Sequence, residues 1–290
     1  TDMTGAMASR RDFGDGFYLT TAFMDLATAS YFPDRSALTD PTASPLGWHN
    51  DGSEAYTITR GNNVYAYEDR NDADAPGYSP DGDTSGTGIL TFDFPVDLTT
   101  QHPHDYQDAA ITNLFYWNNL VHDITYHYGF DEAAGNFQAT NGTGAGLGDD
   151  YVIAEALDGG GVNNANFLTP PDGGNGIMQM YVWTAATPDR TSDLDAGIIV
   201  HEYAHGISNR LSGGPSAAGC VSGDERMGEG WSDFYAVALT MPSNPSRIRG
   251  VGNYADDGAP DDGLLGAFDY MLLLYAGDGV AVSAPGLQPV

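Results

Sequence analysis

Lysine is absent from this chain of 290 residues, and all ten of its basic side chains are arginines. Forty aspartates and glutamates leave a formal net charge of −30 at pH 7 with histidine neutral. Phosphate binding needs clustered cations, so nucleic acid and anionic membrane surfaces are disfavoured as partners. Two explanations of the acidity stay open. One is a high-salt or harsh external medium, where a dense acidic surface keeps a protein soluble; the other is a secreted protein with aspartate-rich turns from a lineage that uses little lysine.

Cysteine and long apolar runs are also scarce. Cys220 is the single cysteine, so no disulfide can form within the chain, and we interpret it as a small loop or core residue. No run approaches the roughly 18 apolar residues of a membrane span. The chain begins Thr1-Asp2, without a positively charged start before an apolar stretch, so we expect a processed or excised fragment. A hydrophobic content of 41% predicts a globular fold.

The most informative stretch is His201-Glu202-Tyr203-Ala204-His205. Residues four apart share one face of a helix, so His201 and His205 can offer two imidazole nitrogens to one metal ion, and neutral imidazoles suit Zn²⁺. Glu202 can reach a metal-bound water and act as general base. Asp195 is the expected N-cap of this helix, and residues 212–215 (Ser-Gly-Gly-Pro) should end it. A chance pair of histidines around a surface glutamate is the alternative for so short a motif.

A second motif, Met-Gly-Glu-Gly-Trp-Ser-Asp at 227–233, lies downstream and opens another predicted helix. Glu229 as a third ligand would complete a His₂Glu site and leave the fourth position for water, as in catalytic zinc sites. Asp233, one turn further on, can accept a hydrogen bond from the free ring nitrogen of a zinc histidine and fix its tautomer. The alternative is an ordinary helix N-terminus, which favours acids.

The two motifs resemble the fungalysin (M36) family of secreted zinc endopeptidases, which are gluzincins related to thermolysin. Further stretches between about residues 40 and 240 resemble the same family, at 44–49, 60–69, 108–119, 163–167 and 178–181. The resemblance implies that His201, His205 and Glu229 are zinc ligands and that Glu202 is the base. It also implies a secreted, extracellular enzyme with protein or peptide substrates.

The same resemblance implies that residues 163–167 form an edge strand that pairs with the substrate backbone, with Asn163, Asn164 and Ala165 as substrate-binding residues. Main-chain hydrogen bonds give affinity in such an arrangement, and side-chain pockets give specificity. A plain strand end with asparagine turns is the alternative.

The predicted fold class is α+β: a β-rich N-terminal region with a long helix, then thermolysin-like zinc-binding helices. Strand-like runs are expected at 55–59, 64–67 and 88–94. Apolar residues recur at helical spacing over 105–128 and Gly129 ends the pattern, while His122 and His127, five apart, are interpreted as structural. We expect an N-terminal extension at 1–40, a catalytic core at 41–241 and a short atypical segment at 242–290.

An acidic loop at 71–88 contains Asp72, Asp74, Asp81 and Asp83, whose carboxylates could bind Ca²⁺. No EF-hand spacing is present, so a solvated loop is favoured. Calcium therefore stays a second candidate cofactor beside Zn²⁺. No repeat appears in the sequence, and no motif in it indicates an oligomeric state.

Histidine is missing from the whole chain after His205. The resemblance implies that a helical domain after the glutamate ligand donates a histidine to the oxyanion of the tetrahedral intermediate. We therefore expect that the C-terminal helical domain is truncated or replaced and that the chain hydrolyses peptides poorly. Only if the chain were fully active would a donor from its N-terminal region be needed, one of Tyr181, His49 or His122. The predicted function is a secreted zinc-dependent endopeptidase. The alternatives are a weak or inactive zinc-binding homologue that acts as a binding module and, ranked lower, an aminopeptidase-type gluzincin.

Overall fold

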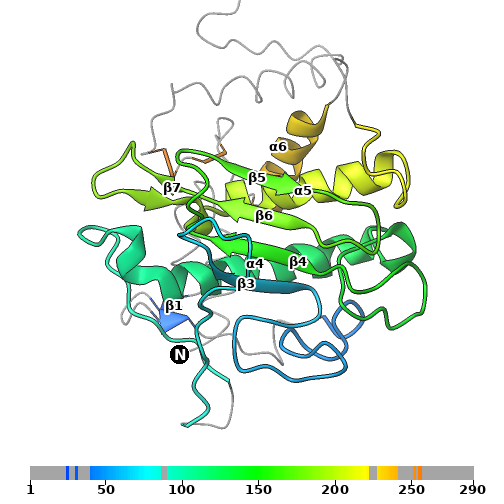
Figure 1. Cartoon of the computed structure of the whole chain (residues 1–290), viewed down its shortest axis with the longest axis horizontal. Helices are drawn as coiled ribbons and strands as arrows, with labels where there is room; N and C mark the ends of the chain where they lie inside the picture. Colours follow the sequence, from blue (N-terminus) through cyan, green and yellow to red (C-terminus); the bar gives the residue numbers. More distant parts are fainter. Residues whose placement is uncertain are drawn as a thin grey trace, which may run out of the picture.

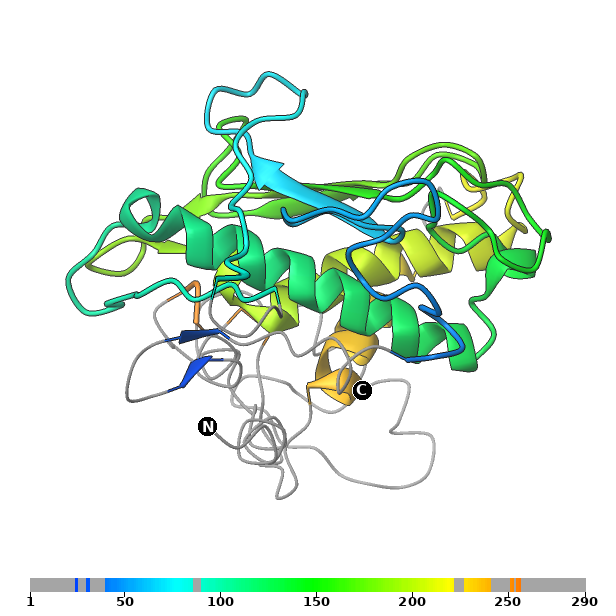
Figure 2. The same ribbon diagram turned by 90° about the horizontal axis from the view of Figure 1, so that it is seen from below.

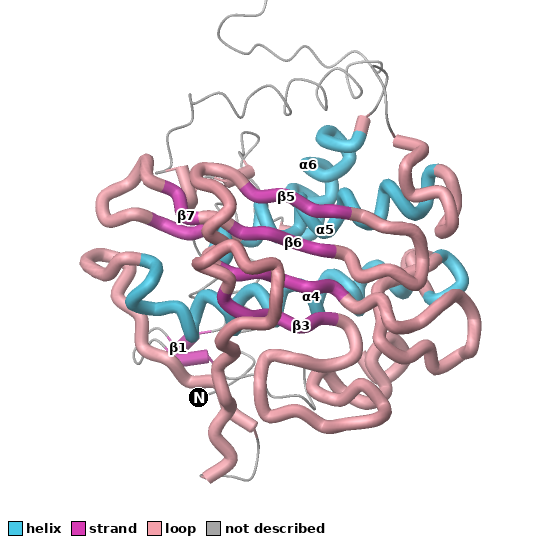
Figure 3. Tube along the Cα trace, in the orientation of Figure 1, coloured by secondary structure: helices cyan, strands magenta, loops and turns pink. Residues whose placement is uncertain are grey.

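The computed structural model of the chain describes residues 24–25, 30–31, 40–85, 90–221, 227–240, 251–252 and 254–256. This part combines three α-helices with short strands, so the predicted α+β class is confirmed for it. Long loops join these elements (Figure 3). No helix within the described ranges is long and apolar enough to cross a membrane.

The central sheet has four strands in the order β3-β4-β6-β5. β3 (Val64–Glu68), β4 (Val152–Ala156) and β6 (Ile177–Met180) run parallel, and β5 (Ala165–Leu168) pairs antiparallel with β6 at one edge. Two small antiparallel pairs accompany the sheet: β1 (Met24–Asp25) with β2 (Ser30–Tyr31), and β7 (Val182–Trp183) with β8 (Arg190–Thr191).

Helices cover one face of the sheet (Figures 1 and 2). α4 (Gln107–His127) continues a 3-10 turn at Pro103–Tyr106, and α5 (Ala196–Ser212) follows another at Ser192–Leu194. A third turn, Glu132–Ala134, lies between α4 and β4, and α6 (Gly228–Leu239) packs on α5. The main core is built from buried apolar side chains of α4, α5 and the sheet, among them Leu114, Trp117, Ala154, Met178, Ile199 and Ile207.

The predicted strands are only partly present. The run 64–67 is confirmed as β3, but 55–59 forms only isolated bridges, Ala55 with Asn50 and Ile58 with Asp81. Its backbone groups bond one at a time to separate segments, so no ladder develops. Residues 88–89 lie outside the described ranges, and from 90 to 94 only Thr91 forms a bridge. The alternating pattern there comes from burial in the core and not from strand pairing.

The long helix predicted over 105–128 is confirmed as α4 and the turn before it. Gly129 follows with φ +98°, a backbone conformation that favours glycine. His122 is buried and contacts Asp123 and Asn136, so its ring belongs to the core network, as interpreted. The expected segments 1–40 and 242–290 lie mostly outside the described residues.

α5 approaches the edge strand β5 most closely at Gly206. A Cβ atom at this position would lie 2.7 Å from the ring of Phe137 and 2.8 Å from that of Phe167. Glycine inside a helix costs about 1 kcal/mol relative to alanine. Here it allows the helix with both histidines to lie directly against the strand that borders the cavity described below.

Candidate metal centre and substrate cavity

α5 is held at both ends, and this sets the direction of its side chains. The Asp195 carboxylate accepts a hydrogen bond from the backbone N–H of Ile198, as predicted for the N-cap, and the helix ends at Ser212 before Gly213. Near the other end, the fully buried Arg210 donates to Asp150 at 2.6 Å and to the carbonyl of Gly174 at 2.7 Å.

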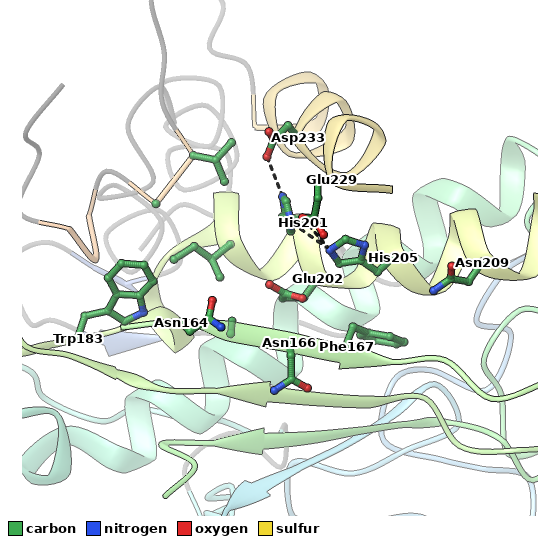
Figure 4. A pocket seen from close by; sticks show the side chains of 14 residues that line it. Asn164, Asn166, Phe167, Trp183, His201, Glu202, His205, Asn209, Glu229 and Asp233 are labelled. Carbon is green, nitrogen blue, oxygen red and sulfur yellow. Dashed lines mark hydrogen bonds and ion pairs between the residues drawn. The ribbon is translucent and has the colours of Figure 1, made fainter. Parts of the chain in front are cut away.

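One face of α5 is buried in the core, and the opposite face is half-buried. His201, His205 and Asn209, at successive spacings of four, lie on the half-buried face. The side chain of Glu202 is 6% exposed, and no residue in the described part of the chain forms a hydrogen bond with its carboxylate. The helix thus presents both histidines and a buried carboxylate to one cavity (Figure 4).

Three donor atoms converge from α5 and α6. The Nε2 atoms of His201 and His205 are 3.1 Å apart, and Oε2 of Glu229 lies 3.1 Å from the first and 3.5 Å from the second. Tetrahedral ligands about 2.0–2.1 Å from a zinc ion are separated by about 3.4 Å. The donor types and their spacing therefore fit a Zn²⁺ ion, and the structure brings the three predicted ligands together.

Asp233 orients the ring of His201 through the ring nitrogen that does not face the other donors. Nδ1 of His201 donates to Oδ1 of Asp233 at 2.8 Å, and the Asp233 side chain is buried. This bond fixes the tautomer in which Nε2 carries a lone pair toward the centre. Burial opposes a charge on His201, but the hydrogen bonds to Asp233 and Glu229 outweigh it and raise the pKa of His201 to about 10, so a metal ion that binds here must displace the proton on Nε2. Hydrogen bonds from His201 and His205 hold the pKa of Glu229 well below its usual value.

Burial raises the pKa of Glu202, and the nearby histidines oppose that rise. A carboxyl group with a raised pKa and no protein partner can both accept and return a proton near neutral pH. Its position next to His201 places it beside the three converging donors.

The cavity has a volume of about 640 Å³ and runs between α5 and the edge strand β5. Asn164 and Ala165 line it, as the resemblance implied, but Asn163 does not. Asn163 has φ 56° and its Oδ1 accepts from the backbone N–H of Thr184 at 2.7 Å, so it shapes the turn before β5.

Asn166 and Phe167, from the same predicted substrate strand, also line the cavity, but sequence reasoning missed the rest of the lining: Trp183, Ile198, Asn209, Val251 and Gly252. Asn209 could have been found, because it continues the four-residue spacing of the two histidines. Trp183 and Val251 carried no signal, since they reach the cavity only through the fold. Val251 and Gly252 line the cavity near the start of α5, and Asp195 ties this segment to the helix because it accepts from the backbone N–H groups of Tyr254 and Ala255.

The substitute oxyanion donors named from the sequence do not line the cavity. His49 is buried and its Nδ1 lies 2.9 Å from the carbonyl of Ile58, while His122 belongs to the core network. The Tyr181 hydroxyl accepts from Asn166 Nδ2 at 2.6 Å. The described structure therefore gives none of the three a place beside the converging donors of His201, His205 and Glu229.

The aspartates of the acidic loop at 71–88 do not form one group. Asp74 lies with Asp69 and Glu155, whose carboxylate oxygens come within 4.8 Å of one another. Asp81 and Asp83 bond elsewhere, to Thr57 and Ser85. All three carboxylates of the cluster already accept hydrogen bonds from protein groups, so the cluster gives no support for calcium.

The sequence profile described as Fungalysin metallopeptidase (M36) matches residues 25–264, a span that runs past both limits of the resemblance noted above. The chain belongs to this family. Similar proteins include the extracellular metalloproteinase MEP of Pyricularia oryzae, which is 49% identical over 217 residues, or 72% of this chain and 33% of that protein. The extracellular metalloproteinase 3 of Trichophyton tonsurans is 48% identical over 212 residues, or 71% and 33% respectively. This fungalysin chain therefore spans about a third of the length of these relatives.

Proposed function

We propose that this fungalysin chain is part of a secreted endopeptidase that hydrolyses peptide bonds of extracellular proteins with one Zn²⁺ ion. His201, His205 and Glu229 would hold the ion, and their convergence is the observation that carries the proposal. Bound there, zinc would polarise the scissile carbonyl and lower the pKa of a water molecule. The names of the relatives, all extracellular metalloproteinases, support the same activity and secretion.

Other residues of the chain would transfer the proton, orient a ligand and bind the substrate. Glu202 takes the proton of the attacking water and returns it to the leaving amine, which its burial and lack of a protein partner support. Asp233 keeps the His201 ring in its binding tautomer. An extended substrate lies along the free edge of β5, past Asn164 and Ala165, and exchanges main-chain hydrogen bonds with that strand.

We also propose that residues 41–241 form the catalytic core and that its pair of zinc helices is thermolysin-like. Among the described residues that line the cavity, the only histidines are the two proposed ligands, and no tyrosine is present. We propose that a further oxyanion donor comes from protein outside this described lining.

The test is the hydrolysis of a quenched protein substrate together with the metal content of the same sample. We expect about one zinc per chain, and activity that disappears with a chelator and returns with Zn²⁺. Zinc without any turnover would support the inactive binding module instead.

A further inference from the structure

We propose that Asn209 is a substrate-binding residue whose Oδ1 atom accepts a hydrogen bond from the substrate backbone, on the amino-terminal side of the cleaved bond. The inference rests on the proposed function, because it takes the occupant of the cavity to be an extended peptide. Asn209 lies on the same half-buried face of α5 as His201 and His205, one turn beyond His205.

The Asn209 side chain is held in place by the end of the edge strand. Its Nδ2 atom donates to Oγ1 of Thr169 at 3.0 Å, and Thr169 directly follows β5. Within the described part of the chain, Oδ1 of Asn209 has no hydrogen-bond partner, although the residue lines the cavity. The bond to Thr169 thus orients the amide and leaves an acceptor facing the space where a peptide would lie.

The two ends of the cavity differ in character. Figure 4 shows Asn209 beyond His205 at one end and Trp183 beyond Asn164 at the other, with the metal donors between them. A peptide that occupies this cavity therefore passes a polar amide at one end and an indole ring at the other.

The direction of β5 sets the direction of a substrate that pairs antiparallel with it. β5 runs from Ala165 to Leu168 and is antiparallel to β6 on its inner edge. A peptide added antiparallel on the outer edge places its amino-terminal part toward Leu168 and Asn209, and its carboxyl-terminal part toward Trp183. Asn209 is four residues beyond His205, or about 6 Å along the helix. An extended chain covers this distance in about two residues, so the contact falls two to three residues before the cleaved bond.

The experiment uses two series of quenched peptides that share one cleaved bond and grow by single residues, one series at the amino end and the other at the carboxyl end. In zinc-loaded Asn209→Leu protein, we expect kcat/KM to fall about two- to tenfold, the effect of one neutral hydrogen bond. The loss should begin only when a peptide has two or three residues before the cleaved bond.

Two further variants serve as controls. Asn209→Asp keeps the acceptor oxygens and should recover most of the loss. Asn71→Leu, the same change on an exposed loop outside the cavity, should leave both series unaltered.

A loss that is equal for all peptides would show that Asn209 only supports the helix, and a loss confined to the carboxyl-terminal series would contradict the direction; either result overturns the proposal. Affinities of the same peptides for a Glu202→Gln background, measured by fluorescence anisotropy, test the contact without turnover. Failure of the proposed function is therefore distinguishable from failure of this inference: with no hydrolysis in any variant, length-dependent binding that is lost in Asn209→Leu still supports the contact, and its absence refutes it.

Discussion

At the scale of single residues, the atoms that would hold a metal and the atom that would move a proton lie on different side chains. His201, His205 and Glu229 turn their donors toward one point, whereas the Glu202 carboxylate lies beside them without a partner in the described residues. Because these roles fall on different side chains, substitutions can remove one and keep the other.

Glu202→Gln should abolish turnover and keep the metal. The amide has the size of the carboxylate but cannot accept the proton of the attacking water, and general-base removal typically lowers kcat by at least about 10²-fold. Zinc content by atomic absorption and kcat on a peptide substrate are measured on the same sample. An unchanged rate of hydrolysis would contradict the assignment of Glu202 as base.

Glu229→Ala should weaken zinc binding more than Asp233→Ala does. The first substitution removes a donor atom, whereas the second removes the hydrogen bond that orients His201 and should cost roughly 10–100-fold in affinity or activity. Competitive titration with a chelator compares the two variants. If Asp233→Ala lost metal more readily, the roles of these carboxylates would have to be exchanged.

Asp193 should make the stability of the fold depend on pH. Burial raises its pKa from 3.8 to about 7, while hydrogen bonds from Thr191 and Leu157 only partly offset the burial. The folded state therefore holds this proton more tightly than the unfolded chain does. The contribution of Asp193 is fully favourable below about pH 4 and is lost as the pH rises through about 7.

Asp193→Asn removes this titration. The difference in free energy of unfolding, variant minus wild type, should rise between pH 4 and pH 8 by an amount on the order of 4 kcal/mol. Each unit of pKa shift corresponds to about 1.4 kcal/mol. Urea unfolding at several pH values measures the difference, with Asp149→Asn on the surface as the matched control. A difference that is constant across this range would contradict the assigned titration.

At the scale of elements, the two ends of α5 connect the site to distant parts of the chain. Asp195 caps the helix and also binds the backbone of Tyr254 and Ala255, while Arg210 joins the other end to Asp150 and to the loop that carries Gly174. The position of His201 and His205 against β5 depends on both attachments.

Arg210→Met should destabilise the protein by about 3–5 kcal/mol, because it leaves the carboxylate of Asp150 buried without its partner. Arg70 provides the matched control, since its pair with Glu68 is partly exposed and Arg70→Met should cost less than about 1 kcal/mol. Free energies of unfolding from urea titration test both values. If both variants lost the same free energy of unfolding, the buried Arg210–Asp150 pair would stabilise α5 no more than an exposed pair does.

At the scale of the whole molecule, the described part of the cavity is built mainly by two elements. β5 and α5 supply most of the lining, and among the described residues after α6 only Val251 and Gly252 contribute. Loss of one oxyanion donor typically costs about 10²–10³ in kcat. Because the described lining holds no histidine besides the two proposed ligands and no tyrosine, we predict that these 290 residues by themselves bind zinc well and hydrolyse peptides poorly.

A longer form that carries the additional sequence of the relatives should have a kcat/KM at least about tenfold higher than these 290 residues, with similar zinc content. The comparison uses one substrate and equal concentrations of zinc-loaded protein. Equal activity of the two forms would mean that the donor for the oxyanion lies within this chain.

The sequence predicted the parts of this protein that depend on local spacing. Histidines four apart on a helix, an aspartate at its start and glycines at its end required no knowledge of the fold, because helix geometry alone places them. The motif that contains Glu229 and Asp233 predicted a second helix, and the structure has both residues on α6 with their carboxylates beside His201. The α+β class followed in the same way from the long apolar pattern of α4 and from β3.

Contacts between distant segments were decided only by the tertiary structure. Whether residues 55–59 form a strand depended on their hydrogen-bond partners, and whether Asp74 or Asp81 joined an acidic cluster depended on loop paths. Trp183, Asn209 and Val251 share one cavity because the sheet edge, the zinc helix and a late segment meet there. The periodicity of a sequence describes only one element at a time, whereas a substrate site is formed by side chains that several elements bring together as they pack.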